Sequence, residues 1–419
     1  MSTNTTAAAQ LAFNAQPSFT GINTAIAPAL QVSIQTVTGG TVANATGNVT
    51  LSLGANPGSA TLSGVLTVAA VNGVATFSDV LVSAAGTGYT LVAQTGNGIA
   101  NATSSPFTIT ATPTGTVTEF TNGLTVGTSE LSGIAAGPDG NVWFTLTASN
   151  NTGASAFTGI GRITPAGLIT QLSGVTYTPN QITLGPNGNL WFTEDNVAQI
   201  GTMTPAGAVT EFKPGVTTGN NPQGITTGPD GNLWYAEQGD NSIGRITTGG
   251  NVTEFSTGIT ANAGLKGITA GPDGNLWFTE SSNQAIGRIT PSGAVTEFTT
   301  GISPGADPGS ITTGPDGNLW FTENGVSGIA SITPSGIVTE YTNGITKGSV
   351  PMAITKGPDG NLWFTENAHN AIGRITTTGN VTEFTGGITA GANLRSITTG
   401  PDGNLWFTEF DNGIGRIVP

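Results

Sequence analysis

A ten-residue stretch, GPDGNLWFTE at 271–280, recurs in close copies through most of the chain. The copies begin at 137, 185, 228, 271, 314, 357 and 400, so the spacing is 48 residues once and 43 residues five times. All seven tryptophans lie in these copies: Trp143, Trp191, Trp234, Trp277, Trp320, Trp363 and Trp406. A period in the forties with one Trp per strand-like run is typical of a β-propeller. Seven copies predict seven blades.

Each repeat divides into four short strands separated by turn signals. In the copy at 267–298, GITAG is followed by a PDGN turn, LWFTE, a polar loop, AIGRIT, a PSG turn and VTEF. Glycine supplies the positive φ that tight hairpin turns require. Four antiparallel strands of about five residues make one propeller blade. Trp277 and Phe278 are adjacent and therefore on opposite faces, so we expect them to fill the interfaces on both sides of a blade.

The strand count predicts how the ring closes. The chain ends in GRIVP, which is a third strand, whereas the first VTEF run, at 117–120, precedes every Trp. We therefore expect 117–120 to complete the last blade as its outer strand. Such closure removes the exposed edge of an open ring. The predicted fold is all-β, with the seven-bladed propeller at 116–419.

Residues 1–112 differ in composition and predict a separate domain. They contain one charged residue, Asp79, and no Lys or Arg. Seven strand-like runs, at 11–14, 30–37, 48–53, 65–70, 73–77, 89–93 and 107–111, favour a β-sandwich. The segment at 56–95 resembles the immunoglobulin-like domains of bacterial surface and secreted proteins, and Tyr89 in GTGYTL resembles their corner tyrosine. That resemblance implies an extracellular spacer or adhesive module, joined to the propeller by a linker at 113–115.

Bulk composition excludes several classes of function. The formal net charge of −14 and the absence of a basic stretch argue against nucleic acid as a partner. Without cysteine the chain has neither disulfides nor Cys-ligated metal sites. No run of 18 apolar residues predicts a membrane span, and MSTNTTAAAQ lacks the features of a secretion signal. We expect a secreted or cell-surface protein whose leader has been removed or whose export uses another route.

A composite pattern covers residues 116–419. It consists of P-x-x-I-T-x-G-P-D-G-N-L-W-F-T-E, followed by I-G-R-I-T and then by G-x-V-T-E-F. It resembles the streptogramin lyases, the virginiamycin B lyase family. The resemblance implies elimination at the ester of a cyclic depsipeptide antibiotic. It also implies a magnesium ion, acidic residues from the blade strands and catalytic histidines two residues before the Ile of the inner strands.

The chain departs from that family at the histidines. The matching positions are Ser132, Asn180, Gln223, Lys266, Gly309, Met352 and Arg395. The single histidine, His369, stands instead in a polar loop, where we interpret it as solvated. A general base must titrate near the working pH, which histidine does most readily. We therefore expect a non-catalytic protein, with no cofactor beyond the Mg²⁺ that the resemblance implies.

Six glutamates that end the WFTE-type strands admit two interpretations. They could form a ring of carboxylates around the propeller mouth, able to hold a divalent cation. Alternatively, four could pair with the arginine of the next strand: Glu237/Arg245, Glu280/Arg288, Glu366/Arg374 and Glu409/Arg416. Glu194 and Glu323 lack that arginine, because Thr202 and Ser331 replace it. Glu194 and Glu323 are therefore the candidate metal ligands.

The variable loops are expected to emerge on one face, which is where rigid scaffolds commonly carry binding sites. The candidate ligand-face residues are Gln223, Lys266, Met352, His369 and Arg395. Two functions follow. The first is a surface binding or scaffold protein with a protein or glycan partner, or with self-assembly at a surface. The second is an enzyme resembling the streptogramin lyases with a divergent active site.

Overall fold

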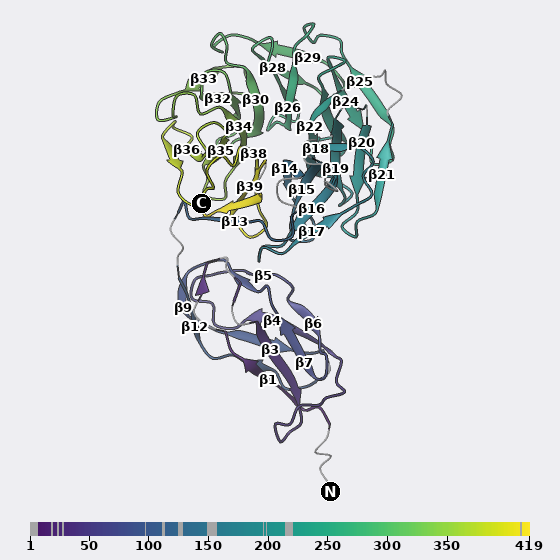
Figure 1. The fold of residues 1–419 in the computed structure, drawn as a ribbon, viewed down its shortest axis with the longest axis vertical. Helices are drawn as coiled ribbons and strands as arrows, with labels where there is room; N and C mark the ends of the chain where they lie inside the picture. The colour runs from purple at the N-terminus through teal and green to yellow at the C-terminus, as the bar shows by residue number, and fades with distance from the viewer. Residues whose placement is uncertain are drawn as a thin grey trace. The chain divides into compact units, whose positions relative to one another are not determined.

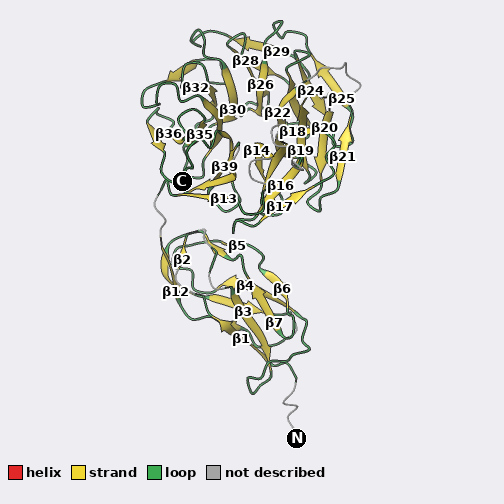
Figure 2. Cartoon of the chain, viewed as in Figure 1, coloured by secondary structure: helices red, strands yellow, loops and turns green. Residues whose placement is uncertain are grey.

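The computed structural model describes residues 7–419 except 18–19, 23–24, 27–28, 97, 111–113, 125–128, 149–156, 196, 198, 214–220 and 411–412. The described residues form strands, turns and loops without a helix, so the chain is all-β as predicted (Figure 2). None of these residues belongs to a helix long and apolar enough to cross a membrane. The chain divides into two compact units, Met1–Pro113 and Thr114–Pro419.

The second unit is a β-propeller of four-stranded antiparallel sheets, here called blades, arranged around a common centre (Figure 1). The first three are β14 (Ser129–Ala136), β15 (Val142–Ala148), β16 (Gly159–Ile163), β17 (Ile169–Leu172); β18 (Thr178–Leu184), β19 (Leu190–Asp195), β20 (Gln199–Met203), β21 (Val209–Phe212); and β22 (Pro222–Thr227), β23 (Leu233–Glu237), β24 (Ser242–Ile246), β25 (Val252–Phe255).

The next three blades repeat the pattern. They are β26 (Leu265–Ala270), β27 (Leu276–Glu280), β28 (Ala285–Ile289), β29 (Val295–Phe298); β30 (Pro308–Thr313), β31 (Leu319–Glu323), β32 (Gly328–Ile332), β33 (Val338–Tyr341); and β34 (Pro351–Lys356), β35 (Leu362–Glu366), β36 (Ala371–Ile375), β37 (Val381–Phe384).

The last blade combines both ends of the propeller sequence. Its strands β38 (Leu394–Thr399), β39 (Leu405–Glu409) and β40 (Gly413–Ile417) are completed by β13 (Val117–Phe120). β13 runs antiparallel to β40, with Val117 opposite Ile417 and Phe120 opposite Ile414. The predicted outer strand is therefore in place, and β40 has no free edge.

Tryptophan and phenylalanine fill the interfaces on the two sides of each blade. Trp277 packs with Leu319 and Phe321 of the following blade, whereas Phe278 packs with Trp234 of the preceding blade. All seven tryptophans have an exposed fraction of 0%. The indole Nε1 of Trp277 donates to Asp273 Oδ1 of the PDGN turn at 3.0 Å, so burial leaves its polar atom paired. The prediction for these side chains is confirmed.

The glycine of the third strand makes room for this packing. A Cβ atom on Gly287 would lie 2.0 Å from the Phe278 ring, which sits opposite it in the sheet. A side chain at this position would displace the ring, and the third strands keep the glycine in every blade except the fifth, where Ala330 stands opposite Phe321.

The first unit is built of shorter strands: β1 (Gln10–Ala15), β2 (Thr20–Gly21), β3 (Leu30–Gln35), β4 (Asn48–Leu53), β5 (Leu62–Ser63), β6 (Thr67–Ala69), β7 (Val74–Phe77), β8 (Leu81–Val82), β9 (Gly86–Tyr89), β10 (Leu91–Gln94), β11 (Ala102–Thr103) and β12 (Phe107–Thr110). Their sheets have the orders β1-β3-β7, β11-β10-β4-β6, β2-β12-β9 and β5-β8.

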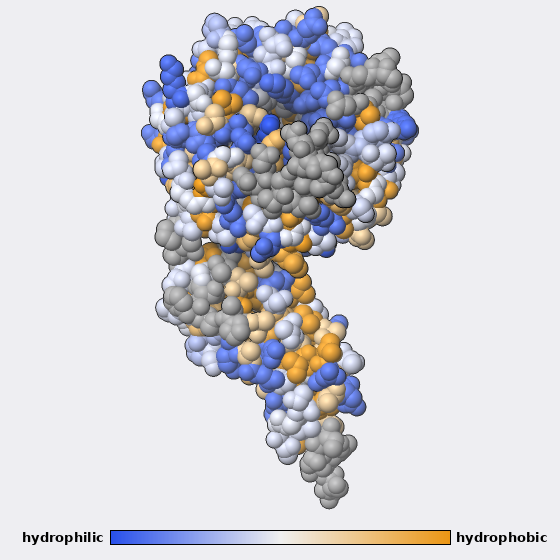
Figure 3. Space-filling view, in the orientation of Figure 1, coloured by the Kyte–Doolittle hydropathy of each residue, from blue (hydrophilic) through white to orange (hydrophobic). Residues whose placement is uncertain are grey.

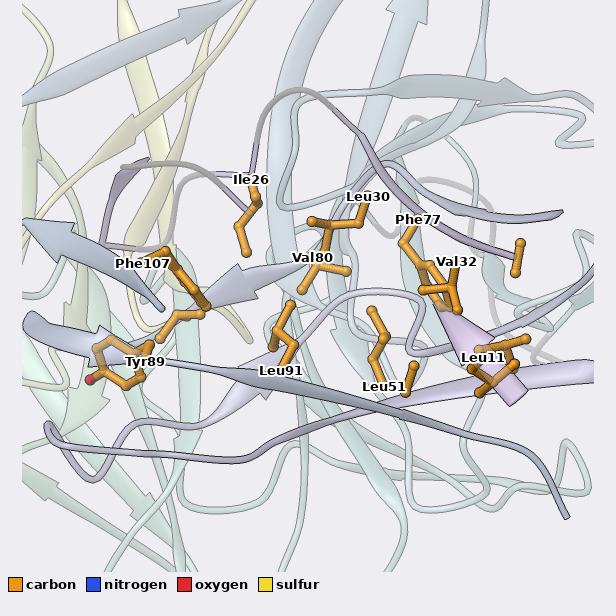
Figure 4. Close-up of a cluster of buried hydrophobic side chains, with 14 of the residues drawn as sticks. Leu11, Ile26, Leu30, Val32, Leu51, Phe77, Val80, Tyr89, Leu91 and Phe107 are labelled. Atoms are coloured by element: carbon orange, nitrogen blue, oxygen red, sulfur yellow. The ribbon is translucent and has the colours of Figure 1, made fainter. Parts of the chain in front are cut away.

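One predicted strand of the first unit, at 89–93, is two. The chain passes from one sheet to another at Thr90, because β9 pairs with β12 and β10 pairs with β4. Tyr89 is fully buried at this point, and its hydroxyl donates to the carbonyl of Ala84 at 2.9 Å. Figure 4 shows its ring among the apolar side chains of the core, close to Phe107. The predicted linker at 113–115 lies partly outside the described residues.

We predict that the propeller depends on β13. Deleting 1–121 removes this strand, leaves the edge of β40 unpaired and strips Phe120 from Trp406, whose ring centroid lies 5.4 Å away. Deleting 1–112 retains all of these contacts. We expect the longer deletion to aggregate or to lose several degrees of melting temperature relative to the shorter one, as measured by thermal unfolding and size-exclusion chromatography. Equal melting temperatures would contradict the closure.

Candidate functional site

Every inner strand of the propeller carries a β-bulge at the same place. In β26 the register shifts between Leu265 and Ile268, so that two residues stand where the ladder has room for one. A bulge redirects the side chains that it carries. The first extra residue of each bulge is one of the positions matched above to the histidines that the family resemblance implies, and we call these the ring residues: Ser132, Asn180, Gln223, Lys266, Gly309, Met352 and Arg395.

The ring residues line one central cavity of about 340 Å³. Inner strands from all the blades therefore contribute to a single site. The sequence places Gln223, Lys266, Met352 and Arg395 on the ligand face, and the structure brings these four together around the cavity. His369 is elsewhere, with its Nε2 3.7 Å from Oε2 of Glu383.

Threonine hydroxyls hold the bulges in register between blades. Thr279 Oγ1 accepts from the N–H of Gly267 in its own blade at 2.9 Å and donates to the carbonyl of Gly309 in the next blade at 2.7 Å. The same double contact occurs at Thr145, Thr193, Thr322, Thr365 and Thr408. Only backbone atoms of the bulges take part, so the side chains of the ring residues are not needed to build the cavity.

Several ring side chains are tied to one another or to neighbours. Ser132 Oγ donates to Asn180 Oδ1 at 3.0 Å, and Asn180 Nδ2 donates to Asp195 Oδ1 at 2.9 Å. Lys266 Nζ forms an ion pair with Asp307 Oδ1 at 2.8 Å.

A second cavity, of about 280 Å³, adjoins this chain of polar groups. Glu130, Asp195, Arg395 and Phe410 are among the residues that line it. The Arg395 guanidinium lies 4.3 Å from the Phe410 ring centroid, and its Nε is buried without a hydrogen-bond partner among the described residues. Burial raises the pKa of Asp195 above its usual range, although the hydrogen bond from Asn180 opposes the shift.

Sequence reasoning missed Asp195 and Glu130. A signal for Asp195 exists, because it is the only acidic residue directly after a WFTE-type strand. Its importance is not visible without the structure, since the cavity combines residues from the first, second, third and last blades.

The predicted glutamate–arginine pairs are wrong. The hairpin register places Arg288 opposite Trp277 and places Ala285 opposite Glu280. The arginine therefore lies at the PDGN end of the blade, 3.8 Å from Asp273 and over the Trp277 ring. Arg162 likewise stands opposite Trp143 rather than Leu146 and lies 3.3 Å from Asp139.

This correction removes the reason for singling out Glu194 and Glu323 as metal ligands. Both are fully buried, like Glu280, Glu366 and Glu409, and none of the five lines either cavity. Each instead stands beside the glutamate of the outer strand in its own blade, and at least one of its carboxyl oxygens is buried without a hydrogen-bond donor among the described residues. We call these the carboxyl pairs: Glu194–Glu211, Glu280–Glu297, Glu323–Glu340, Glu366–Glu383 and Glu409–Glu119.

The surroundings of the carboxyl pairs favour protonation. Burial, followed by the charge of the outer partner, raises the pKa of each inner glutamate to about 8. Ionising a fully buried carboxyl beside a second, half-buried carboxylate with no intervening cation is costly.

A magnesium ion does not fit the donor groups of the described residues. No cluster of three or more His, Asp or Glu side chains occurs among them. Hard cations need about six oxygen ligands, and a carboxyl pair supplies two carboxyls. The outer carboxylate is already engaged, since Glu297 accepts from the backbone N–H of Thr260 at 2.6 Å.

Comparison with known proteins identifies the family. The sequence profile of the virginiamycin B lyase family matches residues 107–258 and 218–419. The chain belongs to the virginiamycin B lyase family. A search of curated proteins found no match.

Solved structures of the family superpose on the propeller. A streptogramin B lyase is 33% identical with a TM-score of 0.65, over 72% of this chain and 96% of the other. A catalytically inactive virginiamycin B lyase from Staphylococcus aureus, in complex with quinupristin, is 35% identical with a TM-score of 0.65, over 73% and 99%. The extracellular domain of a putative hybrid two-component system from B. thetaiotaomicron, 16% identical with a TM-score of 0.53 over 78% and 44%, shares the fold alone.

The third blade offers a test of the threonine contacts, because Ala236 stands where the other threonines stand. We predict that Ala236→Thr joins Gly224 to Lys266 and raises stability by about 1 kcal/mol, the worth of a typical hydrogen bond. Thermal unfolding should show an increase of about 2 °C. Ala236→Val is the control of equal shape without the hydroxyl, and an equal increase in this variant would contradict the prediction.

Proposed function

We propose that the protein is a non-catalytic, secreted or cell-surface binding protein whose ligand occupies the central cavity. In this proposal the propeller is complete with seven blades, and the first unit is an immunoglobulin-like sandwich that displays it. The near absence of charge in residues 1–112 supports a surface module.

The composition of the ring residues carries the proposal. The resemblance to the family implies histidine bases at these positions, and Gln223, Gly309 and Met352 cannot accept a proton there. The amine of Lys266 is engaged in an ion pair with Asp307. Removal of a carbon-bound proton needs a base within hydrogen-bond reach of the substrate. The ring residues supply none.

The same positions suit recognition of a polar partner such as a glycan or a peptide chain. Amide groups of Asn180 and Gln223 offer donors and acceptors, and the Arg395 guanidinium lies against the Phe410 ring, 4.3 Å from its centroid. The guanidinium of arginine presents its N–H groups as a rigid planar fork, so the side chain loses little conformational entropy for each hydrogen bond that it forms with a ligand. Because threonine contacts build the cavity wall, changes of the ring side chains can alter recognition without loss of the fold.

One observation favours the alternative, an enzyme resembling the streptogramin lyases with a divergent active site. Asp195 and Glu130 line the second cavity, and burial raises the pKa of Asp195. A carboxylate whose pKa is raised is a stronger base than an ordinary one. Asp195 is therefore the residue on which the enzyme alternative depends.

Binding can be tested on arrays of bacterial glycans and of peptides. We predict that signals of the wild-type protein disappear in the double variant Lys266→Ala/Arg395→Ala, whose melting temperature should stay within a few degrees. The matched control is Leu168→Ala, which alters a residue that is 68% exposed and lines neither cavity. Equal signals from the double variant and the wild type would exclude the cavity as the site.

Catalysis can be tested with quinupristin, using mass spectrometry to detect the linear product with and without Mg²⁺. We predict no linear product above the level of a protein-free sample, with an active streptogramin B lyase as the positive control. Turnover that is lost in Asp195→Asn would overturn the non-catalytic proposal and support the enzyme alternative.

A further inference from the structure

We propose that the two glutamates of each carboxyl pair share one proton. The shared proton holds the loop that runs from the outer strand of one blade to the inner strand of the next against the blade. Loss of this proton as the pH rises loosens the loop. The proposal is independent of the ligand. It concerns five buried sites that lie outside both cavities and repeat from blade to blade.

The strand register brings the two carboxyls of a pair together. Glu280 stands opposite Ala285, and Glu297 stands opposite Gly287, two residues further along the same middle strand. Residues two apart share one face of a sheet, so Glu280 and Glu297 project on the same face from the two strands that flank the middle strand, across its very small residues Ala285 and Gly287. Glu280 is fully buried, its Oε1 has no hydrogen-bond donor among the described residues, and the charge of the neighbouring Glu297 acts on its carboxyl. A hydrogen bond between two carboxyls requires that one of them carries a proton.

The outer member of each pair is also the anchor of a loop. Both oxygens of Glu297 are engaged by Thr260, one by its backbone N–H and one by its hydroxyl, each at 2.6 Å. Glu383 holds Thr346 and Glu119 holds Thr389 through the same two contacts.

These anchored threonines lie in the segments that lead from the outer strand of one blade to the inner strand of the next. These segments lead into β26, β34 and β38, whose second residues are the ring residues Lys266, Met352 and Arg395. The protonation of a pair therefore acts on the segment that delivers a ring residue to the central cavity.

Few other polar groups face the pairs. Asn283 donates to Glu280 at 3.4 Å, Ser349 faces Glu366, and His369 lies 3.7 Å from Glu383. Asp195 follows Glu194 directly in the chain. Among the described residues no lysine or arginine lies within ion-pair distance of a pair.

Two blades provide comparisons within the chain. In the first blade, uncharged residues replace both members of the carboxyl pair: Leu146 replaces the inner glutamate and Gln171 replaces the outer one. In the third blade Glu237 Oε2 instead accepts from the hydroxyl of Ser242 at 2.6 Å. Ser242 occupies the place of Ala285, so a neutral hydroxyl can supply the hydrogen that other pairs obtain from a proton.

The sign of the pH dependence follows from linkage. The pKa of the inner glutamates is raised from 4.5 to about 8 by burial and then by the outer carboxylate. The contribution of the pairs to stability is therefore fully present below pH 4.5 and is lost as the pH rises to about 8. Asp273 has the opposite pH dependence. Burial raises its pKa, but hydrogen bonds from Asn275 and Trp277 outweigh burial and lower the pKa below its usual value. The contribution of Asp273 to stability is therefore lost on acidification below about pH 4.

The experiment measures the melting temperature of the full chain between pH 4 and pH 9. We expect the wild-type value to be highest near pH 5 and to fall by at least about 10 °C by pH 8.5. In the variant Glu280→Gln/Glu366→Gln/Glu409→Gln the inner side chains donate at every pH, so the fall should shrink by half or more. Glu130→Gln, the same change outside the pairs, should leave the fall unchanged. An unchanged fall in the triple variant would overturn the proposal.

A second arm covers the case in which the triple variant does not fold. Ala285→Ser/Ala371→Ser copies the serine of the third blade and should also reduce the fall, and no reduction would count against the proposal. Calcium chloride at pH 8.5 distinguishes a proton from a cation. If calcium raised the wild-type melting temperature to its value at pH 5, the pairs would be metal sites and the proposal would be wrong.

Hydrogen exchange tests the loops directly. Peptides that contain Thr260, Thr346 and Thr389 should lose protection between pH 6 and pH 8.5, after correction for intrinsic exchange, while the triple variant keeps it. Uniform loss of protection over the whole propeller would show a general change in stability and would contradict the assignment to the loops.

Discussion

Burial of tryptophan between neighbouring blades is the interaction on which this structure depends. A four-stranded blade cannot bury its two apolar faces alone, so each blade is stable only against its neighbours. Trp277 covers one side and Phe278 the other, and Asp273 satisfies the indole N–H so that the large ring can be fully buried. Ring closure follows from the same need. Without β13, Trp406 would lose the Phe120 ring that stacks on it at 5.4 Å.

The threonine contacts separate the scaffold from the site. Thr279 links the bulges of two blades through backbone atoms only, which leaves the side chains at the cavity free to differ. A family fold can therefore persist while the groups that perform its chemistry are exchanged. Polar and apolar residues are interspersed over the visible face of the propeller in Figure 3, and the exposed large apolar residues Leu168 and Ile337 lie apart in the sequence, each in a PAG or PSG turn segment. The central cavity is the feature on which the binding proposal rests.

The acidic character of the chain also has a structural part. The inner glutamates are not a solvated ring around the mouth but buried partners of the outer glutamates, and Glu297 uses both oxygens to hold a loop. A net charge of −14 at pH 7, counted from the sequence, therefore overstates the charge of the folded protein wherever a pair retains its proton. Stability and the order of the ligand face are expected to be coupled through these pairs.

The sequence alone indicated the propeller, the four-strand division of each repeat and the closing role of 117–120, because repeats with a fixed period and alternating faces leave little freedom. It also located Gln223, Lys266, Met352 and Arg395 on one face, since each occupies the same place in its repeat. Only the tertiary structure decided what the glutamates contact. Hairpin register, set by the turns, moves Arg288 to the opposite end of the blade from Glu280. Asp195 and Arg395 line one cavity only because the ring brings the second and last blades to a common centre, a proximity that no spacing along the chain encodes.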